Sequence, residues 1–308
     1  MTKHLNSILE GDALKKLKEL PDQFVNMCMT SPPYWALRDY GVKGQLGLEP
    51  TFDEYINKLC NIFDEVKRVL RDDGTCWVNL GDTYFGSGKC AGVDNTPRTI
   101  KGKLPDKTLT MIPMRFAIEM VNRGWILRNT IIWHKRSCMP SSVKDRFTVD
   151  FEYLFFFSKK KNYYFETQYE GYSKATRDDS RFNPGSKKNH TYDRKTEHQP
   201  NELKIKAQRG GFKQGNEKGR NKRTVWTINP KPFKDSHFAV YPEELCETPI
   251  KAGCSKGGIV LDPFFGAGTT GVVALKQSKK FIGIELNPEY IEIAKARLKP
   301  YLEQRKLI

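Results

Sequence analysis

The stretch GIVLDPFFGAGTTG at residues 258–271 predicts a short strand, a glycine-rich turn and the start of a helix. It contains the pattern G-x-G-x-x-G beginning at Gly266, and the next apolar run ends on an acidic residue, Glu285, 19 positions later. Glycines in such a turn let the backbone come close to a ligand, and a carboxylate at the end of the next strand can accept hydrogen bonds from ribose hydroxyls. Together these features indicate a nucleoside-binding unit.

Two neighbouring features favour an adenosine cofactor that carries an amino acid over a dinucleotide. Asp262 directly precedes the turn, and a carboxylate there would repel a pyrophosphate but can pair with an ammonium group. Only 23 residues follow Glu285, too few for the further strand–helix units of a dinucleotide fold. We therefore expect the remaining strands to come from the N-terminal half of the chain.

Outside this unit the sequence alternates strand-like and helix-like patterns. Thr51 and Glu54 form a capping box ahead of a helix whose apolar residues recur at helical spacing as far as Leu70. Further helices are expected at 112–122, stopped by Gly124, at 269–276 and after Asn287-Pro288; strands are expected at 25–29, 75–80, 129–133, 153–157, 258–263 and 281–285. This alternation predicts an α/β fold with an open, mostly parallel sheet and helices on both faces.

The positive charge of the chain is concentrated in one stretch. The 308 residues include 52 Lys and Arg against 36 Asp and Glu, a net charge of +16 that predicts an anionic partner. Residues 171–223 hold 15 Lys and Arg against 6 Asp and Glu and have few apolar side chains. They cannot form a core of their own, so we expect a basic, loop-rich insertion there, with a solvated linker as the alternative.

Cysteine usage and hydropathy exclude several classes of protein. The seven cysteines form no C-x-x-C pair, which argues against a disulfide framework or a zinc ribbon and favours the reduced thiols of a cytoplasmic protein. No apolar run approaches the roughly 18 residues of a membrane span. The first residues lack the apolar core of a secretory signal. A secreted or membrane-spanning protein is therefore not expected.

A second motif, TSPPYW at residues 30–35, follows the strand predicted at 25–29 and should lie at the carboxyl edge of the sheet, where open α/β folds bind ligands. Its prolines present carbonyl acceptors without N–H donors, beside a hydroxyl and two aromatic rings. That set suits a flat substrate bearing an NH₂ group. A rigid turn whose aromatic rings pack into the core is the alternative. Asp82, beyond the strand at 75–80, borders this edge, and a direct role for it is left open.

Both motifs resemble those of a known family. Ser31-Pro32-Pro33-Tyr34 resembles the catalytic tetrapeptide of DNA methyltransferases that act on exocyclic amines, and the turn from Asp262 to Thr270 resembles their S-adenosylmethionine motif. The order of catalytic motif, basic insertion and cofactor motif resembles the permuted beta group of this family. The resemblance implies a Rossmann-like methyltransferase fold with a mostly parallel seven-stranded sheet and a late antiparallel hairpin. Residues 1–170 would form its catalytic half, 171–223 a target-recognition insertion, and 224–308 the cofactor-binding half.

The resemblance also implies three groups of site residues. The catalytic residues would be Ser31, Pro32, Pro33 and Tyr34, with Trp35 as a base-stacking helper. The cofactor would contact Asp12, His237, Asp262, Pro263, Phe264, Gly266, Gly268, Thr269, Thr270 and Glu285. DNA would contact Arg177, Arg181, Arg194, Arg209, Arg220 and Arg223. No metal is expected.

The implied reaction moves a methyl group from S-adenosylmethionine to an amino nitrogen of a base flipped out of double-stranded DNA. Ser31 Oγ and the Pro32 carbonyl would accept the amine hydrogens, and Tyr34 would stack on the base. A serine at the first position of the tetrapeptide favours cytosine-N4 as the target, with adenine-N6 as the alternative. Cytosine-C5 chemistry is not expected, because the sequence contains no Pro-Cys dipeptide for a nucleophile.

Some implications of the resemblance concern the setting of the enzyme. It would act in the cytoplasm of a bacterium or archaeon or be encoded by a phage, and it could accompany a cognate restriction endonuclease. Members of the group often form homodimers. Two more distant alternatives are an NAD-binding dehydrogenase, which would have no use for the motif at 30–35, and a nucleic-acid-binding protein without catalysis.

Overall fold

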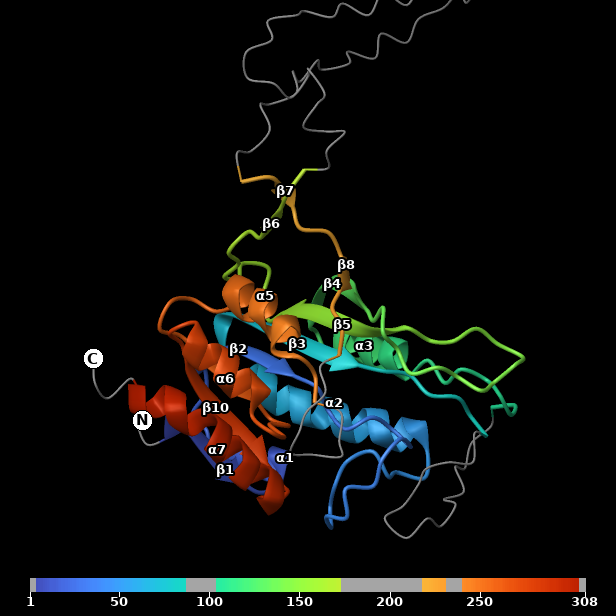
Figure 1. Ribbon diagram of the computed structural model, residues 1–308. Coiled ribbons are helices and arrows are strands. Elements are labelled where there is room, and N and C mark those ends of the chain that lie inside the picture. Colours follow the sequence, from blue (N-terminus) through green and yellow to red (C-terminus); the bar gives the residue numbers. More distant parts are fainter. Residues whose placement is uncertain (1–3, 87–103, 173–217, 231–239, 305–308) are drawn as a thin grey trace, which may run out of the picture. The chain divides into compact units, whose positions relative to one another are not determined.

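The computed structural model describes residues 4–86, 104–172, 218–230 and 240–304 (Figure 1). The chain divides into two compact units, one made of Met1–Glu166 with Thr224–Ile308 and the other of Thr167–Arg223. Among the described residues, no helix combines the length and the apolar character needed to cross a membrane.

The larger unit is built on one eight-stranded sheet. Its strands lie in the order β1 (Ser7–Glu10), β10 (Lys280–Glu285), β9 (Ile259–Asp262), β2 (Val25–Thr30), β3 (Leu70–Leu80), β5 (Phe151–Ser158), β4 (Ile126–His134) and β8 (Val225–Thr227). All neighbours are parallel except β5, which is antiparallel to both β3 and β4. The mostly parallel sheet and its late antiparallel pair are thus confirmed.

The eighth strand is a correction to the seven that were expected. β8 has three residues and pairs in parallel with β4 at the edge of the sheet. It follows directly on the basic stretch, and three residues are too few to show an alternating pattern in the sequence. Its central residue, Trp226, is buried.

Strands from distant parts of the sequence interleave at the centre of the sheet. β9 and β10 lie between β1 and β2, so the cofactor-type unit is completed by strands of the N-terminal half, as expected. The chain proceeds from β9 toward one edge through β10 and from β2 toward the other through β3 (Figure 1). Such a reversal opens a crevice outside the carboxyl ends of the two central strands, where ligands bind in open α/β sheets.

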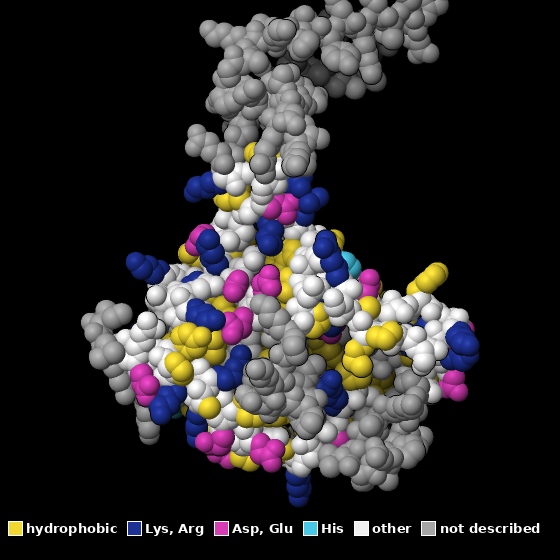
Figure 2. Space-filling view, in the orientation of Figure 1, with side chains coloured by type: hydrophobic (Ala, Val, Ile, Leu, Met, Phe, Trp, Pro, Cys, Tyr) yellow, Lys and Arg dark blue, Asp and Glu magenta, His cyan; other side chains and the backbone are white. Residues whose placement is uncertain are grey.

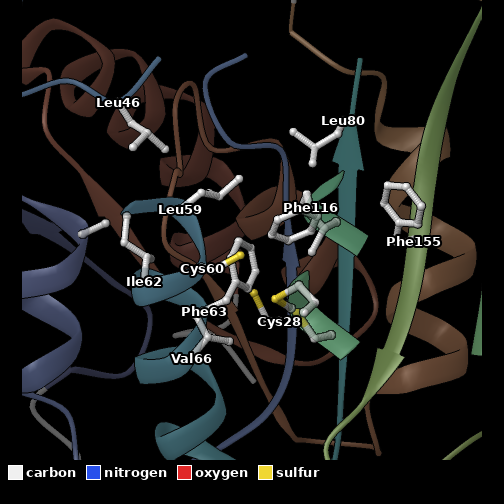
Figure 3. Packing of buried hydrophobic residues seen from close by; sticks show 14 of the residues in the cluster. Cys28, Leu46, Leu59, Cys60, Ile62, Phe63, Val66, Leu80, Phe116 and Phe155 are labelled. Atoms are coloured by element: carbon white, nitrogen blue, oxygen red, sulfur yellow. The ribbon is translucent and has the colours of Figure 1, made fainter. Parts of the chain in front are cut away.

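Helices cover both faces of the sheet, as the alternating pattern predicted. One face carries α1 (Ala13–Lys18), α2 (Phe52–Val69) and α3 (Ile112–Asn122), and the other carries α5 (Glu243–Gly253), α6 (Thr269–Lys276) and α7 (Pro288–Gln304). Side chains of β2 alternate between the two cores: Cys28 packs into the first, and Met27 and Met29 into the second. Figure 3 shows the first core, in which Phe63 of α2 and Phe116 of α3 meet with ring centroids 5.2 Å apart.

Local signals located α2 and α3 accurately, whereas α1 and α5 were not predicted. The Thr51 hydroxyl accepts a hydrogen bond from the Glu54 amide (3.2 Å), one half of the capping box, and the apolar positions predicted for α2 are buried. α3 occupies the range expected for it, and Gly124 beyond its end has a φ of +80°. Glycine has no Cβ, so it adopts a left-handed φ of that kind without steric strain, which is why it often ends helices.

Asp82 has a structural role at the start of α3. Met111, the residue before that helix, is left-handed and has no side-chain cap. The Asp82 carboxylate takes over this function by accepting hydrogen bonds from the Ile112 amide (3.1 Å) and the Thr110 hydroxyl (2.9 Å). Burial raises the pKa of Asp82, against the lowering effect of these donors.

The smaller unit is described over residues 167–172 and 218–223. β6 (Tyr169–Glu170) and β7 (Arg220–Asn221) pair antiparallel. The Glu170 carboxylate lies between two guanidinium groups, with Arg220 Nε at 2.8 Å and Arg223 Nε at 2.5 Å. The other four arginines expected to contact DNA lie outside the described residues. On the face in Figure 2, basic and acidic side chains of the described residues are interspersed rather than separated by sign.

Candidate active site

A cavity of about 900 Å³ lies at the carboxyl edge of the sheet in the larger unit. It is bordered by the residues that follow β1, β10, β9 and β2, by the end of β3 and by the start of the antiparallel strand β5. Of the expected site residues it is lined by Asp12, Ser31, Pro32, Pro33, Tyr34, Pro263, Phe264, Gly266, Thr269 and Glu285. The structure thus brings both sequence motifs to one cavity. His237 lies outside the described residues.

The glycine turn serves two separate purposes. Gly266 (φ +51°) has no atom within 4 Å of the place where a Cβ would stand, so its backbone faces open space. Gly268 (φ +80°) is the N-cap of α6 and does not line the cavity. A Cβ on Gly271 would lie 2.6 Å from the Phe265 ring, so the third glycine of the pattern is required for packing rather than for a ligand.

Glu285 closes the turn from the end of β10. Its carboxylate accepts hydrogen bonds from the backbone amides of Gly266 (2.6 Å), Leu286 (2.9 Å) and Asn287 (2.8 Å). Burial raises the pKa of this carboxyl, while the three donors lower it. A carboxylate has about four acceptor positions, so one remains toward the cavity. Glu285 can therefore hold the turn and still accept a ligand hydroxyl.

Asp12 marks the other end of this part of the cavity. It is the N-cap of α1, and its Oδ1 accepts a hydrogen bond from the Lys15 amide at 3.0 Å. The cap fixes the carboxylate at the rim of the cavity, directly beyond the end of β1.

Asp262 does not line the cavity, contrary to the expected pairing with a cofactor ammonium group. Its side chain has no exposed area, and its oxygens accept hydrogen bonds from Thr30 (2.6 Å), Thr270 (2.7 Å), Tyr241 (3.1 Å) and the Phe264 amide (3.0 Å). Burial raises its pKa, and these hydrogen bonds oppose that effect. The side chain points into the protein because four protein donors satisfy it there. Asp262 and Thr270 therefore join β9, β2 and α6 beneath the cavity.

The residues of the second motif lie at the opposite end of the cavity. Ser31 Oγ donates a hydrogen bond to Asn79 Oδ1 (3.2 Å), and the Tyr34 hydroxyl donates to Glu152 Oε2 (2.6 Å). Burial raises the pKa of Tyr34 well above its usual value, and the Glu152 carboxylate raises it further. The Tyr34 ring lies against the backbone of Gly81, where a Cβ would approach it to 2.6 Å. Tyr34 is thus held as a neutral, oriented ring.

The two prolines of the motif differ in their environment. The Pro33 carbonyl accepts a hydrogen bond from the Tyr55 hydroxyl at 2.8 Å. No hydrogen bond among the described residues ends on the Pro32 carbonyl, which lies at the cavity wall. Pro32 therefore offers an unused acceptor beside Ser31.

Trp35, expected as a base-stacking helper, is a core residue that does not line the cavity. It is 1% exposed, its ring nitrogen donates to the Glu49 carbonyl (2.9 Å), and its ring meets that of Phe52 edge-on. The side chains of Tyr34 and Trp35 leave the turn in different directions, the first toward the cavity and the second into the core. The alternative of a rigid turn with buried aromatic rings thus holds for Trp35.

Sequence reasoning missed three cavity residues that contact the second motif or each other. Asn79 lies near the end of β3, Glu152 near the start of β5, and Lys135 directly after β4. The Lys135 ammonium group is ion-paired with the Glu152 carboxylate and lies 4.3 Å from the centroid of the Trp133 ring. The signal for Glu152 was available: an antiparallel strand begins at the edge where its parallel neighbours end.

The family is decided by comparison with known proteins. The model of the N6/N4 DNA methylase family matches residues 25–296. This chain belongs to that family. It is 40% identical over 302 residues to the type II methyltransferase M.Cfr9I of Citrobacter freundii, covering 95% of this chain and 87% of the relative. It is 38% identical to M.SmaI of Serratia marcescens, covering 94% and 90%.

Solved structures, one of them of a DNA methyltransferase, share the fold. The PvuII DNA methyltransferase, which is cytosine-N4-specific, has a TM-score of 0.64 at 20% identity and is matched over 96% of this chain and 90% of its own. M1.HpyAVI in complex with S-adenosylmethionine has a TM-score of 0.54 at 19% identity, over 95% and 98%. The methyltransferase fold and the enzyme class expected from the two motifs are confirmed, and the dehydrogenase alternative is wrong.

Proposed function

We propose that this DNA methyltransferase methylates the N4 amino group of a cytosine flipped out of a specific duplex sequence. The observation that carries the proposal is Ser31: its hydroxyl oxygen and the unused Pro32 carbonyl lie together at the wall of the cavity that also holds the glycine turn. In the resembling enzymes a serine at this position is usual for cytosine-N4, whereas Asp or Asn is usual for adenine-N6.

S-adenosylmethionine is the methyl donor of the family, and the residues at one end of the cavity fit it. Gly266 leaves its backbone open to a ligand, Glu285 retains an acceptor for a ribose hydroxyl, and Asp12 lies at the rim for a donor on the adenine end. Pro263, Phe264 and Thr269 complete this wall, while Asp262, Gly268 and Thr270 support it from beneath. When bound, S-adenosylmethionine supplies an electrophilic methyl group on its sulfonium.

The chain's own residues make the target nitrogen reactive. The lone pair of an exocyclic amine is delocalised into the ring, which makes the nitrogen a weak nucleophile. Ser31 Oγ and the Pro32 carbonyl accept hydrogen bonds from its two N–H groups, which favours a pyramidal nitrogen whose lone pair is free to attack. The nitrogen gains the methyl group as the bond from that group to the sulfonium sulfur breaks, and it then releases one of its two protons to water. The nitrogen becomes pyramidal only near the transition state, so these hydrogen bonds stabilise the transition state more than the bound substrate. They therefore lower the barrier to methyl transfer. The Tyr34 ring stacks on the base and offsets part of the few kcal/mol that flipping costs.

The basic stretch at 171–223 is proposed to bind the duplex around the target. Its excess of Lys and Arg suits phosphate neutralisation, which fixes position, while a few side chains would read base edges. Arg220 and Arg223 share Glu170, so they are better suited to holding the β6–β7 pair together than to reading sequence. Because the relatives are type II methyltransferases, we also propose that the mark protects DNA from a restriction endonuclease with the same recognition sequence.

The test is to express the gene in a host that lacks the mark, sequence its DNA by a single-molecule method and analyse its nucleosides by mass spectrometry. N4-methylcytosine at one motif is the expected result. N6-methyladenine would overturn the assignment of the target while keeping the site. The Ser31→Ala variant, with its folding verified by circular dichroism, is the matched control and should mark only a small fraction of the sites.

A further inference from the structure

We propose that Asn79 and Glu152 are positioning residues that fix the hydroxyl hydrogen of Ser31, so that its oxygen presents only lone pairs to the target amine. This inference rests on the proposed function, in which Ser31 is the acceptor. It assigns a role to two residues that neither sequence motif contains.

The orientation of the Asn79 amide is determined by its neighbours. Its Nδ2 lies 3.1 Å from the backbone carbonyl of Tyr153 and 3.1 Å from Glu152 Oε2. A carbonyl and a carboxylate can only accept, so the NH₂ side of the amide must face them. A reversed amide would place its oxygen against the Tyr153 carbonyl and the Glu152 carboxylate, and no hydrogen bond would then form with either acceptor. The other side, Oδ1, therefore faces Ser31 and Tyr34, and with 1% exposure the side chain has no room to turn.

The orientation of Asn79 decides what Ser31 can offer. A hydroxyl group has one hydrogen and two acceptor positions. The Asn79 Oδ1, 3.2 Å from Ser31 Oγ, takes the hydrogen, and the two lone pairs remain for the cavity. Without Asn79 the hydroxyl could rotate and donate to the amine nitrogen instead. That hydrogen bond would occupy the lone pair that must attack the methyl group.

Glu152 connects Asn79 to the rest of the site. Its Oε2 accepts from both Asn79 Nδ2 and the Tyr34 hydroxyl, and its Oε1 is ion-paired with Lys135. The lysine balances the charge of a carboxylate whose side chain is only 17% exposed, which reduces the cost of holding that charge there. One carboxylate thus fixes the Tyr34 ring for stacking and, through Asn79, the Ser31 hydroxyl.

A double-mutant cycle on the full chain tests the inference. Single-turnover methyl transfer from radiolabelled S-adenosylmethionine to unmethylated plasmid DNA would be measured for Ser31→Ala, Asn79→Ala and the double variant. We expect Asn79→Ala to slow the reaction roughly tenfold, as for one lost orienting hydrogen bond, without changing the dissociation constants for cofactor or DNA. In the Ser31→Ala background the same substitution should cause no further loss, because no hydroxyl is left to orient.

Two further variants separate positioning from folding. Asn79→Leu keeps the branched shape and the number of heavy atoms of the buried side chain without its hydrogen bonds and should slow the reaction as Asn79→Ala does, which guards against loss of folding in the alanine variant. Asn26→Ala is the matched control. The Asn26 amide also joins two strands, because its oxygen accepts a hydrogen bond from the Ile259 backbone amide (2.9 Å), but it lies at the opposite edge of the sheet. The Asn26→Ala variant should therefore methylate DNA at the wild-type rate.

The outcomes distinguish this inference from the proposed function. Full activity in Ser31→Ala would overturn the acceptor role itself. A Ser31→Ala variant that is slowed as expected, combined with independent, multiplying effects of the two substitutions, would overturn the role of Asn79 alone. A matching loss of cofactor affinity in both Asn79 variants would also overturn it, because the residue would then support the cavity as a whole.

Discussion

The two ends of the cavity are built in different ways. At the cofactor end, residues 262–285 supply the strand end, the turn and the carboxylate that closes it, since Gly266 and Glu285 are 19 positions apart. At the target end, Ser31 is bonded to Asn79, 48 positions away, and Asn79 to Glu152, another 73 positions on. The glycine turn and its carboxylate at the first end come from one continuous piece of sequence, to which Asp12 is added from beyond β1, whereas the second end exists only once β2, β3 and β5 are side by side. Substitutions at the two ends should therefore affect different quantities.

The largest effect is expected at the target end. Ser31→Ala removes an acceptor that acts chiefly in the transition state, so the single-turnover rate should fall roughly 100- to 1000-fold. The dissociation constant for S-adenosylmethionine, measured by calorimetry, should stay within about twofold of wild type. A rise in that constant equal to the loss in rate would mean that the two ends are not separable.

The next effect belongs to the cofactor end. Glu285→Ala removes both the ribose acceptor and the group that holds three backbone amides, so S-adenosylmethionine should bind roughly 10- to 100-fold more weakly. At saturating cofactor the methyl-transfer rate should recover most of its wild-type value. An unchanged dissociation constant would remove Glu285 from the cofactor site.

Asp262→Asn alters the carboxylate buried beneath the cofactor end of the cavity and should have a smaller effect on cofactor binding. The carboxylate is enclosed by four protein donors, so its charge has no contact with a ligand. The dissociation constant for S-adenosylmethionine should change by about threefold or less. A direct ion pair with the cofactor's ammonium group would instead cost roughly tenfold or more on this substitution. That result would restore the pairing expected from the sequence.

The smallest effect on activity is expected for Trp35→Phe. This change removes a hydrogen bond to Glu49 and part of a buried ring, so the free energy of unfolding should fall by about 2 kcal/mol in urea denaturation. The methylation rate below the unfolding transition should match wild type. A selective loss of rate with unchanged stability would return Trp35 to the site.

The same contrast explains how much could be predicted from the sequence. Helix α2, helix α3 and the glycine turn follow from caps, spacing and glycines that lie within a few residues of one another. The short strand β8 carries no local pattern, and it forms because β4 offers an unpaired edge. Asn79 is an ordinary polar residue in a strand, and only the neighbouring β5 turns its amide toward Ser31. Asp262 was expected to face a ligand because a sequence shows a carboxylate but not the four donors around it.

The interleaved strand order determines when, during synthesis, the enzyme can first bind its cofactor. β2 pairs with β9, and the Asn26–Ile259 hydrogen bond joins residues 233 positions apart. During synthesis one edge of β2 therefore stays without its neighbour until β9 has left the ribosome, and the floor that Asp262 builds cannot form earlier. A chain still being translated has no place to hold a methyl donor, so methylation begins only after the last third of the protein has been made.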